Sequence, residues 1–425
     1  MLNRKCLVIA LLLLSISTFA KAKEIYFDNN ATTPCDIRIM KVMAPYFTEK
    51  FGNANSITHE HGRIAHIAVE KARNQIASGI GALPEEIIFT SGATESNNIA
   101  IKGVARMYKR LNGKNHIITA KTEHKCVLES FRELENEGFI VTYLDVQKNG
   151  LINLDDLKKV ITHNTILVSI MTVNNEIGVI QNISKIGDIC KKNGVFFHTD
   201  AAQAIGKIPF NVSEMNVDLV SISGHKMYGP KGIGAVYIKK GIEVQPLFSG
   251  GGQEGGIRSG TLPVPLCVGL GEAITVAIKE MPEESKRILK IRNQMYEKIT
   301  KSLDGVYLNG DLKERIPGNL NLTFAKVDLA DLLKELKGFA VSAGSACTSE
   351  AYLSYVIKAL DPEETMPPAS IRICIGRFNT EKEAVLLADR IIEVVKKLRI
   401  EKPDAGKRAC DILKEKSKQF IDSIR

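Results

Sequence analysis

The chain has 425 residues, of which 44% are apolar and 25% are charged, and it contains no tryptophan. This composition predicts a globular protein with a large core and two domains. Much of the net charge of +9 lies near the end, where ten basic residues stand against five acidic ones from Lys396 onward. Because no zinc-type cysteine spacing, aromatic interleaving or recognition-helix pattern accompanies this charge, a nucleic-acid-binding function is not supported.

Residues 1–22 form a candidate targeting segment. Asn3-Arg-Lys5 precedes an apolar run from Leu7 to Leu14, and Ala20-Lys-Ala22 has the small-residue pattern of a cleavage site. These features predict a secretory signal that is too short to span a membrane in the mature chain. The eight cysteines are scattered without a C-x-x-C pair, which is typical of a reducing compartment. The localisation therefore has two interpretations: exported or periplasmic, and cytoplasmic.

Residues 23–282 are expected to form a large domain whose first residues pack on the small one. Short apolar runs alternate there with helical ones, and this alternation predicts a mainly parallel sheet. The expected strands are Ile117–Thr119, Ile140–Leu144, Ile166–Met171, Val195–His198, Leu219–Ser221 and Gly234–Ile238, and the expected helices include Val127–Glu137 and Ile183–Lys192. A polar helical stretch from Glu283 to Ser302 opens a smaller α/β domain over 283–400. Residues 401–425 are predicted to be a basic tail helix.

The first candidate binding segment follows the short strand Glu86–Thr90. Its sequence is Ser91-Gly-Ala-Thr-Glu-Ser-Asn-Asn98, and an apolar-periodic helix continues from it. Small residues at a strand-to-helix turn leave backbone amides exposed, and the helix dipole favours an anion there. Gly92, Ala93 and Thr94 are therefore predicted to cradle a phosphate. A plain helix cap is the alternative for this segment taken alone.

An acid and a lysine follow at the ends of two later strands. Asp200 ends a buried apolar strand, where it could pair with the pyridine nitrogen of pyridoxal phosphate (PLP), and Gln203 could reach the ring hydroxyl. Lys226 follows Ser223 and His225 at the start of a glycine-rich turn. A lysine in such a place can form a Schiff base. Together with the phosphate cradle, the two residues predict a PLP site.

Cys347 stands in the segment Ser342-Ala-Gly-Ser-Ala-Cys-Thr-Ser, which has no large apolar residue nearby. Most unpaired cysteines are buried small hydrophobic residues, and the other seven cysteines are interpreted in that way. A loop of small polar residues suits an exposed thiol, and only the thiolate is nucleophilic. PLP together with such a thiol predicts chemistry at the sulfur of a substrate.

At this point the sequence resembles the cysteine desulfurases of the class-V aminotransferase family. The resemblance covers roughly residues 24–395 and rests on eight motifs in family order: Ser91-Gly-Ala-Thr-Glu-Ser-Asn-Asn, Thr122-Glu-His-Lys, Val173-Asn-Asn-Glu-Ile-Gly, His198-Thr-Asp-Ala-Ala-Gln, Ser223-Gly-His-Lys, Arg258-Ser-Gly-Thr, Ser345-Ala-Cys-Thr-Ser and Ile371-Arg-Ile-Cys-Ile-Gly-Arg. The Cys347 loop resembles group I, the nitrogen-fixation and iron–sulfur-assembly type. The resemblance implies the PLP-dependent transferase fold type I, an α/β fold with a large, mainly parallel seven-stranded sheet and a smaller α/β C-terminal domain.

The resemblance also implies a role for each matching residue. Lys226 holds PLP and carries the α-proton, and His124 stacks on the ring and assists proton transfer. Arg372 and Asn175 bind the carboxylate of L-cysteine. Cys347 takes up the substrate sulfur as a persulfide, and L-alanine is released. The implied cofactor-binding residues are Ala93, Thr94, Asn175, Asp200, Gln203, Ser223, His225, Lys226 and Thr261.

Partners are implied in the same way. Thr261 reaches the phosphate of the other subunit, so a homodimer is expected. A sulfur acceptor or iron–sulfur scaffold protein is a further expected partner, with Cys347 as a transient iron–sulfur ligand shared with it. The alternative activities are selenocysteine lyase and another class-V PLP aminotransferase or lyase, which would not need the Cys347 loop. A non-catalytic scaffold subunit is disfavoured because Lys226 and Cys347 are both present.

Three features depart from the family pattern. The segment Gln253-Glu-Gly-Gly256 lacks an arginine that is frequent there, and the Ser-Pro-Leu motif associated with scaffold docking is not visible near the C-terminus. Cys374 stands where a serine is common, two residues after Arg372. It is interpreted as a buried residue of similar shape, with a second thiol beside the site as the alternative.

Overall fold

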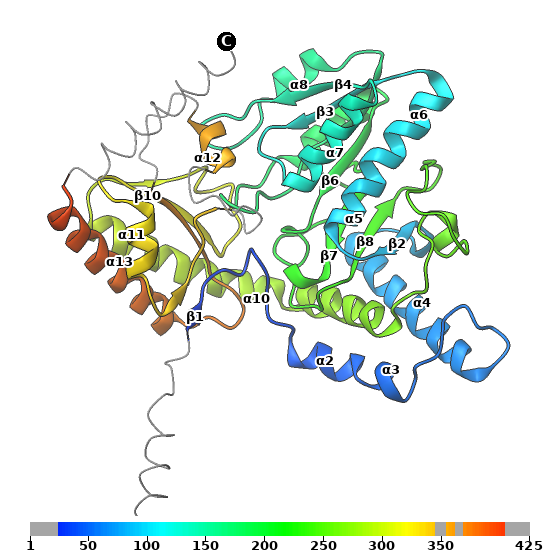
Figure 1. Cartoon of the computed structure of the whole chain (residues 1–425), viewed down its shortest axis with the longest axis horizontal. Coiled ribbons are helices and arrows are strands. Elements are labelled where there is room, and N and C mark those ends of the chain that lie inside the picture. Colours follow the sequence, from blue (N-terminus) through cyan, green and yellow to red (C-terminus); the bar gives the residue numbers. More distant parts are fainter. Residues whose placement is uncertain (1–23, 345–353, 362–368, 404–425) are drawn as a thin grey trace, which may run out of the picture.

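The computed structural model describes residues 24–344, 354–361 and 369–403. Its larger part is built on a seven-stranded sheet with the strand order β2-β8-β7-β6-β5-β3-β4 (Figure 1). Only β8 runs against the other strands of this sheet. The prediction of a mainly parallel seven-stranded sheet is therefore confirmed. The strands are β2 (Ile87–Thr90), β3 (His116–Ala120), β4 (Ile140–Leu144), β5 (Thr165–Ser169), β6 (Phe196–Asp200), β7 (Leu219–Ser223) and β8 (Gly234–Ile238).

Helices cover both faces of this sheet, which gives three layers. One hydrophobic cluster joins the sheet to α2, α4, α9 and α10, and another joins its opposite face to the run from α5 to α7. Strands covered on both faces need continuous apolar runs, and every residue of β3, β5 and β7 is buried. The helices are α2 (Ile37–Met43), α3 (Pro45–Thr48), α4 (Glu60–Ile80), α5 (Ala93–Asn98), α6 (Val104–Asn112), α7 (Lys125–Asn136), α8 (Leu154–Val160) and α9 (Ile183–Lys192).

A second, smaller unit has its own core. Its sheet has the order β12-β10-β9 and is antiparallel, with β9 (Val306–Leu308), β10 (Asn319–Phe324) and β12 (Ser370–Cys374). Helices α11 (Leu329–Glu335) and α13 (Glu381–Glu401) belong to this unit, and α12 (Tyr355–Leu360) packs in a separate small cluster. The segment Ile25–Phe27 also belongs to it, because β1 (Ile25–Tyr26) pairs with β11 (Phe339–Ala340) and Phe27 is buried in its core. The exact domain boundaries stay a prediction.

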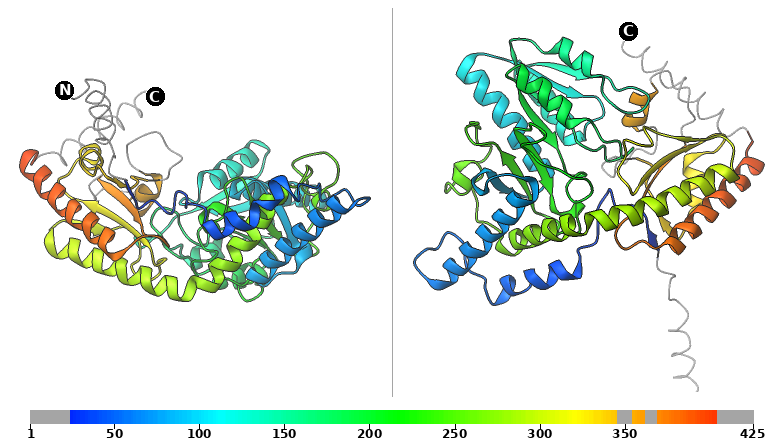
Figure 2. Two further views of the ribbon diagram at one scale, coloured as in Figure 1. Left: turned by 90° about the horizontal axis from the view of Figure 1, so that it is seen from below. Right: turned by 180° about the vertical axis from the view of Figure 1, so that it is seen from behind.

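Helix α10 (Val264–Ser302) connects the two units and lies in front when the molecule is seen from behind (Figure 2, right). The sequence predicted a helix only from Glu283, directly after Pro282, and that start is wrong. Pro282 lies inside a continuous helix of 39 residues. Proline removes one backbone donor from a helix, and here apolar residues on both sides of it, from Cys267 to Ile299, pack into the two cores and hold the helix together. In the ranges described, no helix combines the length and the hydropathy that crossing a bilayer requires.

Candidate active site

The carboxyl ends of the parallel strands border a cavity of about 450 Å³. In an open α/β sheet this edge is where ligands bind. The segments after β2, β3, β5, β6 and β7 all contribute to its wall, and Arg372 reaches it from the smaller unit. Eleven of the residues predicted from the sequence line this one cavity: Gly92, Ala93, Thr94, His124, Asn175, Asp200, Gln203, Ser223, His225, Lys226 and Arg372.

Lys226 is placed by a single helical turn, Gly224–Lys226, that begins where β7 ends. Its Nζ donates hydrogen bonds to the carbonyl oxygens of Asn30 at 2.8 Å and Ala31 at 2.7 Å. Both acceptors belong to the N-terminal segment, which had no predicted role. The segment from the start of the chain therefore forms part of the cavity wall and sets the position of the reactive amine.

Asp200 is the last residue of β6 and only 6% exposed. Its Oδ2 accepts from Nδ2 of Asn97 at 2.7 Å, and its Oδ1 accepts from the backbone N–H of Ala202 at 2.9 Å. Two neutral donors thus fix the direction of a buried carboxylate. A carboxylate held in this way suits the ring nitrogen of PLP, which needs a negative partner to stay protonated.

His124 is the N-cap residue of α7, and its ring orientation follows from that position. Its Nδ1 accepts from the backbone N–H of Cys126 at 3.3 Å and lies 3.0 Å from Sγ of Cys126. Because Nδ1 is an acceptor, the neutral ring carries its proton on Nε2. Burial lowers the pKa of His124 and raises the pKa of the Cys126 thiol to about 12. A neutral imidazole and a protonated thiol therefore meet at this wall.

The segment after β2 has the geometry of an anion cradle. Gly92 has a φ of 152°, which other residues rarely adopt, and a Cβ there would meet open space. Helix α5 begins at the next residue and continues through a π-helical segment, Ile99–Gly103, into α6. Across the cavity, Nδ1 of His225 lies 3.0 Å from Oγ1 of Thr32. Burial, followed by the nearby Lys226, lowers the pKa of His225 to about 4, so its ring is neutral at pH 7.

Arg372 is the residue of β12 that enters the cavity, and its side chain is 1% exposed. Nη2 donates to Oδ1 of Asp28 at 2.6 Å, and Nη1 donates to the carbonyl of Asn175 at 3.0 Å. Within the described residues, Nε of Arg372 and Oδ1 of Asn175 have no hydrogen-bond partner. Buried polar atoms are rarely left without one, so these two atoms mark a place for a polar ligand.

The residues present fit PLP. The cavity combines the amine of Lys226, the oriented and buried carboxylate of Asp200, and a helix that begins directly after Gly92. It also contains buried polar atoms of Arg372 and Asn175 that have no hydrogen-bond partner among the described residues. When bound, PLP supplies an acceptor for the electron pair that is left on a substrate carbon when one of its bonds breaks. Lys226 would hold the group, Asp200 would face its ring nitrogen, and the segment that starts at Gly92 would face its phosphate.

Several residues of this site had no role in the sequence analysis. Asp28, Asn30 and Asn97 bind Arg372, Lys226 and Asp200 respectively, as described above. Cys126, interpreted as a buried small hydrophobic residue, is partly buried: it packs against the hydrophobic cluster on the α5–α7 face of the sheet, and its thiol also lines the cavity beside His124. The sequence signal for its place in the site was that Cys126 directly follows the motif Thr122-Glu-His-Lys. The run Asp28-Asn-Asn30 directly after an apolar strand was a signal for the N-terminal segment.

Other predicted residues lie elsewhere. Thr261 is exposed and does not border the cavity of this chain. Cys347, its predicted role as an iron–sulfur ligand, the targeting segment and most of the basic tail lie outside the described residues. Among the residues that are described, no cluster of three or more histidine, cysteine or acidic side chains could hold a metal ion. Cys374 is 1% exposed, and burial raises its pKa to about 11, which favours the interpretation as a buried residue.

The fold and the lysine–acid pair define a PLP-dependent enzyme of fold type I. Residues 25–387 match the Aminotransferase class-V family. The chain is 55% identical to the human protein named cysteine desulfurase over 380 residues, which are 89% of this chain and 83% of the relative. It is also 55% identical to the cysteine desulfurase IscS of Ehrlichia chaffeensis, over 88% of this chain and 92% of that one. The chain therefore belongs to the class-V aminotransferase family and, within it, to the cysteine desulfurases.

Solved structures agree with this assignment. A NifS-like protein superimposes with a TM-score of 0.82 at 38% identity, over 88% of this chain and 99% of the other. A structure described as SspA in complex with cysteine gives a TM-score of 0.74 at 39% identity, over 84% and 100% of the two chains. The predicted family and fold are both confirmed by these likenesses.

Proposed function

We propose that this chain removes the sulfur atom from L-cysteine with the help of PLP, releases L-alanine and retains the sulfur as a persulfide on Cys347. The observation that carries the proposal is the meeting of Lys226, Asp200 and Arg372 in one cavity. The first two suit the cofactor, and the third comes from the smaller unit with a guanidinium nitrogen still to be satisfied. An α-amino acid has the carboxylate that this nitrogen requires.

Each residue then has a defined task. The guanidinium of Arg372 binds and orients the substrate carboxylate, and the amide of Asn175 completes that end of the site. Lys226 removes the α-proton and later returns a proton to the substrate carbon skeleton. His124, neutral and with its proton on Nε2, is a hydrogen-bond donor from the α7 side. In the net reaction a sulfur–sulfur bond forms at Cys347, the carbon–sulfur bond of cysteine breaks, and Cβ takes up a proton.

The test is an assay of the purified full chain loaded with PLP. L-cysteine should yield alanine and, with an added thiol reductant, sulfide in equal amounts. The Lys226→Ala variant should lose both products, and borohydride should no longer attach PLP to the protein. Absence of alanine production by the wild type contradicts the proposal. A strong preference for selenocysteine over cysteine as substrate would instead support the selenocysteine lyase alternative.

A second variant separates the cofactor site from the sulfur acceptor. Cys347→Ser should keep the visible absorbance of bound PLP and still respond to L-cysteine, yet release almost no alanine. The reason is that a serine hydroxyl cannot replace a thiolate as nucleophile at neutral pH. Substantial alanine release by this variant would mean that another thiol accepts the sulfur.

We further propose that two copies of this chain form a homodimer in which Thr261 of each completes the phosphate site of the other. Its exposure outside its own cavity fits this role. Helices α2, α3 and the region up to α4 also expose large apolar side chains, which is typical of interfaces. They are Ile37, Met40, Val42, Phe47, Phe51, Ile57 and Ile67. Sedimentation should show a dimer, and an active monomer would contradict this proposal.

Delivery of the sulfur is the last part of the proposed function. An iron–sulfur scaffold or another sulfur acceptor would receive it from Cys347, and the segment over 1–22 would direct the chain to export. Transfer of ³⁵S from labelled cysteine to co-purified partners identifies the acceptor. Sequencing the mature N-terminus after cell fractionation decides between cleavage after Ala22 and retention of the full chain in the cytoplasm.

A further inference from the structure

Cys126 has a thiol in the wall of the cavity, and none of the roles above uses it. It is the second residue of α7, two positions after His124, and it lines the cavity. Its sulfur contacts polar groups of three neighbours, which are Asn97 and Thr94 of α5 and His124 at the start of α7. These contacts determine from which groups the sulfur accepts hydrogen bonds and to which group it donates one.

The contact between Cys126 and His124 has a defined direction. Burial lowers the pKa of His124 more than the charge of Asp200 raises it, so the ring is neutral. Sγ of Cys126 lies 3.0 Å from Nδ1 of His124, and the backbone N–H of Cys126 donates to the same nitrogen at 3.3 Å. A nitrogen that accepts a hydrogen bond in a neutral imidazole carries no proton of its own. The thiol is therefore the donor in the shorter of the two contacts.

The side-chain amide of Asn97 holds the other side of the sulfur. Asn97 is fully buried, and its Nδ2 donates to Oδ2 of Asp200 at 2.7 Å and to Sγ of Cys126 at 3.2 Å. Because the carboxylate of Asp200 only accepts, it faces the NH₂ group of the amide and not the amide oxygen. Both amide hydrogens are thus used, one on the acid and one on the sulfur.

The third neighbour of the sulfur is Thr94, which belongs to the predicted phosphate cradle. A side-chain hydrogen bond connects Thr94 to the sulfur of Cys126 and favours its negative form, as a donated hydrogen bond does. The sulfur thus accepts from Thr94 and Asn97, and its own hydrogen is left to point at His124. One thiol connects the cradle, the buried acid and the histidine.

The surroundings of Cys126 keep the proton on its sulfur. Burial, followed by the negative charge of Asp200, raises the pKa of Cys126 to about 12, and the nearby Glu123 acts in the same direction. A thiolate would have no proton to donate to His124. Since the sulfur stays a thiol at neutral pH, the S–H donor is present whenever the histidine is neutral.

We propose that Cys126 is a positioning residue of the active site: its thiol donates to Nδ1 of His124 and thereby keeps the ring proton on Nε2. The hydrogen bond at one nitrogen of a histidine decides which of the two nitrogens carries the proton. Asn97 and Thr94 hold the sulfur in place for this contact. The proposal rests on the proposed function, because the tautomer of His124 matters to the reaction only if the ring takes part in it.

Two substitutions separate the hydrogen bond from the volume of the side chain. Cys126→Ser keeps a donor and an acceptor, Cys126→Ala keeps neither, and both leave a similar extra space. Each full-length protein, freed of PLP, is treated at pH 7 with brief pulses of diethyl pyrocarbonate, which reacts with an imidazole nitrogen that carries no proton. Mass spectrometry follows the modification of His124, with the exposed His163 as an internal standard.

His124 should react slowly in the wild type and in the Ser variant, because Nδ1 is covered and Nε2 is protonated. In the Ala variant one hydrogen bond to Nδ1 is lost, so the other tautomer becomes more populated and the relative rate should be about five-fold higher than in the Ser variant. Equal rates in the Ser and Ala variants overturn the proposal. This holds even if both exceed the wild type, because only the extra space would then matter.

A second measurement uses the wild type and does not depend on the folding of a variant. Cys126 should resist iodoacetamide at pH 8 in the PLP-free protein, although it lines the cavity, because iodoacetamide reacts with thiolates. Alkylation of Cys126 as fast as that of free cysteine in the same solution overturns the proposal, since a thiolate cannot donate to His124.

The outcome is distinguishable from a failure of the proposed function. Both measurements are made without PLP and without L-cysteine, so they report on Cys126 and its neighbours. A wild type that forms no alanine contradicts the proposed activity and leaves the modification rates intact. An active wild type whose Ser and Ala variants react alike contradicts only the role of Cys126.

Discussion

Arg372 and Arg377 form similar ion pairs beside the smaller sheet, yet the two arginines have different roles. Arg372 of β12 pairs with Asp28, and Arg377, five residues later, pairs with Asp36 at 3.0 Å. Both acids belong to the N-terminal segment, so each pair ties that segment to the smaller unit. Both guanidinium groups are buried or nearly so. The sequence alone gives no sign that their roles differ, because both arginines belong to the same short motif.

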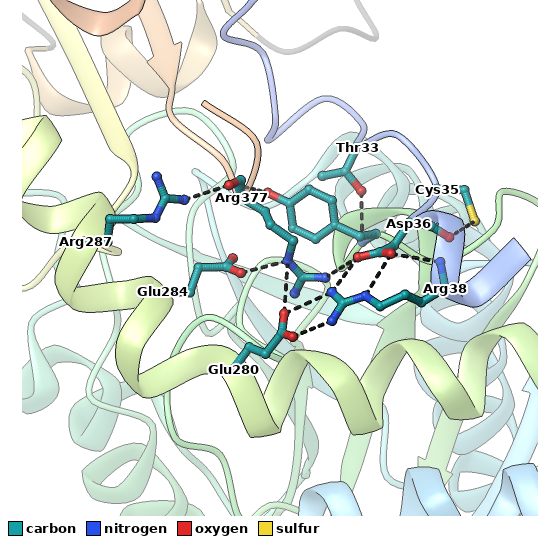
Figure 3. Close-up of polar contacts among 9 residues, drawn as sticks. Thr33, Cys35, Asp36, Arg38, Glu280, Glu284, Arg287 and Arg377 are labelled. Carbon is teal, nitrogen blue, oxygen red and sulfur yellow. Dashed lines mark hydrogen bonds and ion pairs between the residues drawn. The ribbon is translucent and has the colours of Figure 1, made fainter. Parts of the chain in front are cut away.

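Their remaining contacts separate them. Arg377 also binds Glu284 of α10 at 2.7 Å and stacks at 4.3 Å on the ring of Tyr228, and Figure 3 shows it between Asp36 and Glu284. It leaves no buried side-chain nitrogen without a partner in the described part of the chain, whereas Nε of Arg372 has none. An arginine whose buried donors all have partners within the protein is structural. One with a donor left over inside a cavity is ready for a ligand.

The largest expected effect comes from Arg377→Met. This substitution leaves Asp36 and Glu284 without their common buried cation, and removal of one partner of such a cluster costs about 3–5 kcal/mol of unfolding free energy. Urea unfolding measures this loss, and the KM for L-cysteine should change little. Lys298→Met is the matched control, because its pair with Asp389 is more exposed and should contribute about 1 kcal/mol or less. Equal losses in both variants would contradict the structural role of Arg377.

Arg372→Lys should show the opposite pattern. The lysine keeps a positive charge near Asp28 but loses the planar fork that holds a carboxylate, which is worth about 2 kcal/mol. We therefore expect kcat/KM for L-cysteine to fall about 30-fold, with PLP absorbance retained and stability close to that of the wild type. Steady-state kinetics measures the fall. An unchanged kcat/KM would remove Arg372 from the substrate site.

The smallest expected effect is a dependence on pH at Asp36. Hydrogen bonds from Arg38, together with Arg377, hold the pKa of Asp36 well below its ordinary value. A carboxyl group with a depressed folded-state pKa stabilises the fold above its unfolded pKa of about 4 and loses this contribution as the pH falls. The gap in unfolding free energy between the wild type and Asp36→Asn should thus shrink from pH 7 to pH 3. A gap that stays constant over this range would show that the carboxylate charge does not matter.

The parallel sheet and most of the site could be predicted because both depend on short-range patterns. The strands Ile140–Leu144 and Gly234–Ile238 match their predicted bounds. A short apolar run between two turns strongly favours a strand. Asp200 is the last residue of β6 and Lys226 lies in the turn after β7, and the carboxyl ends of parallel strands converge on one edge. Convergence of these residues was therefore a consequence of the fold class.

Errors arose where packing overrides local signals. The sequence predicted a helix only from Glu283, but the two cores that α10 joins keep the helix continuous across Pro282. Cys126 was predicted to be buried from the average behaviour of cysteine, and it is only partly buried. Its place at the start of α7 instead turns the thiol towards His124, and only the position of the helix relative to the sheet determines this.

The sequence by itself determined the family and the fold class, and it predicted the residues that would carry the chemistry, because contiguous motifs and local periodicity encode all three. The tertiary structure decided which neighbour each of these residues meets. Arg372 pairs with Asp28 across 344 positions of the chain, and Asn30 receives Lys226 across 196. Burial, hydrogen bonds and charge at such contacts depend on how distant elements pack, and no local pattern encodes them.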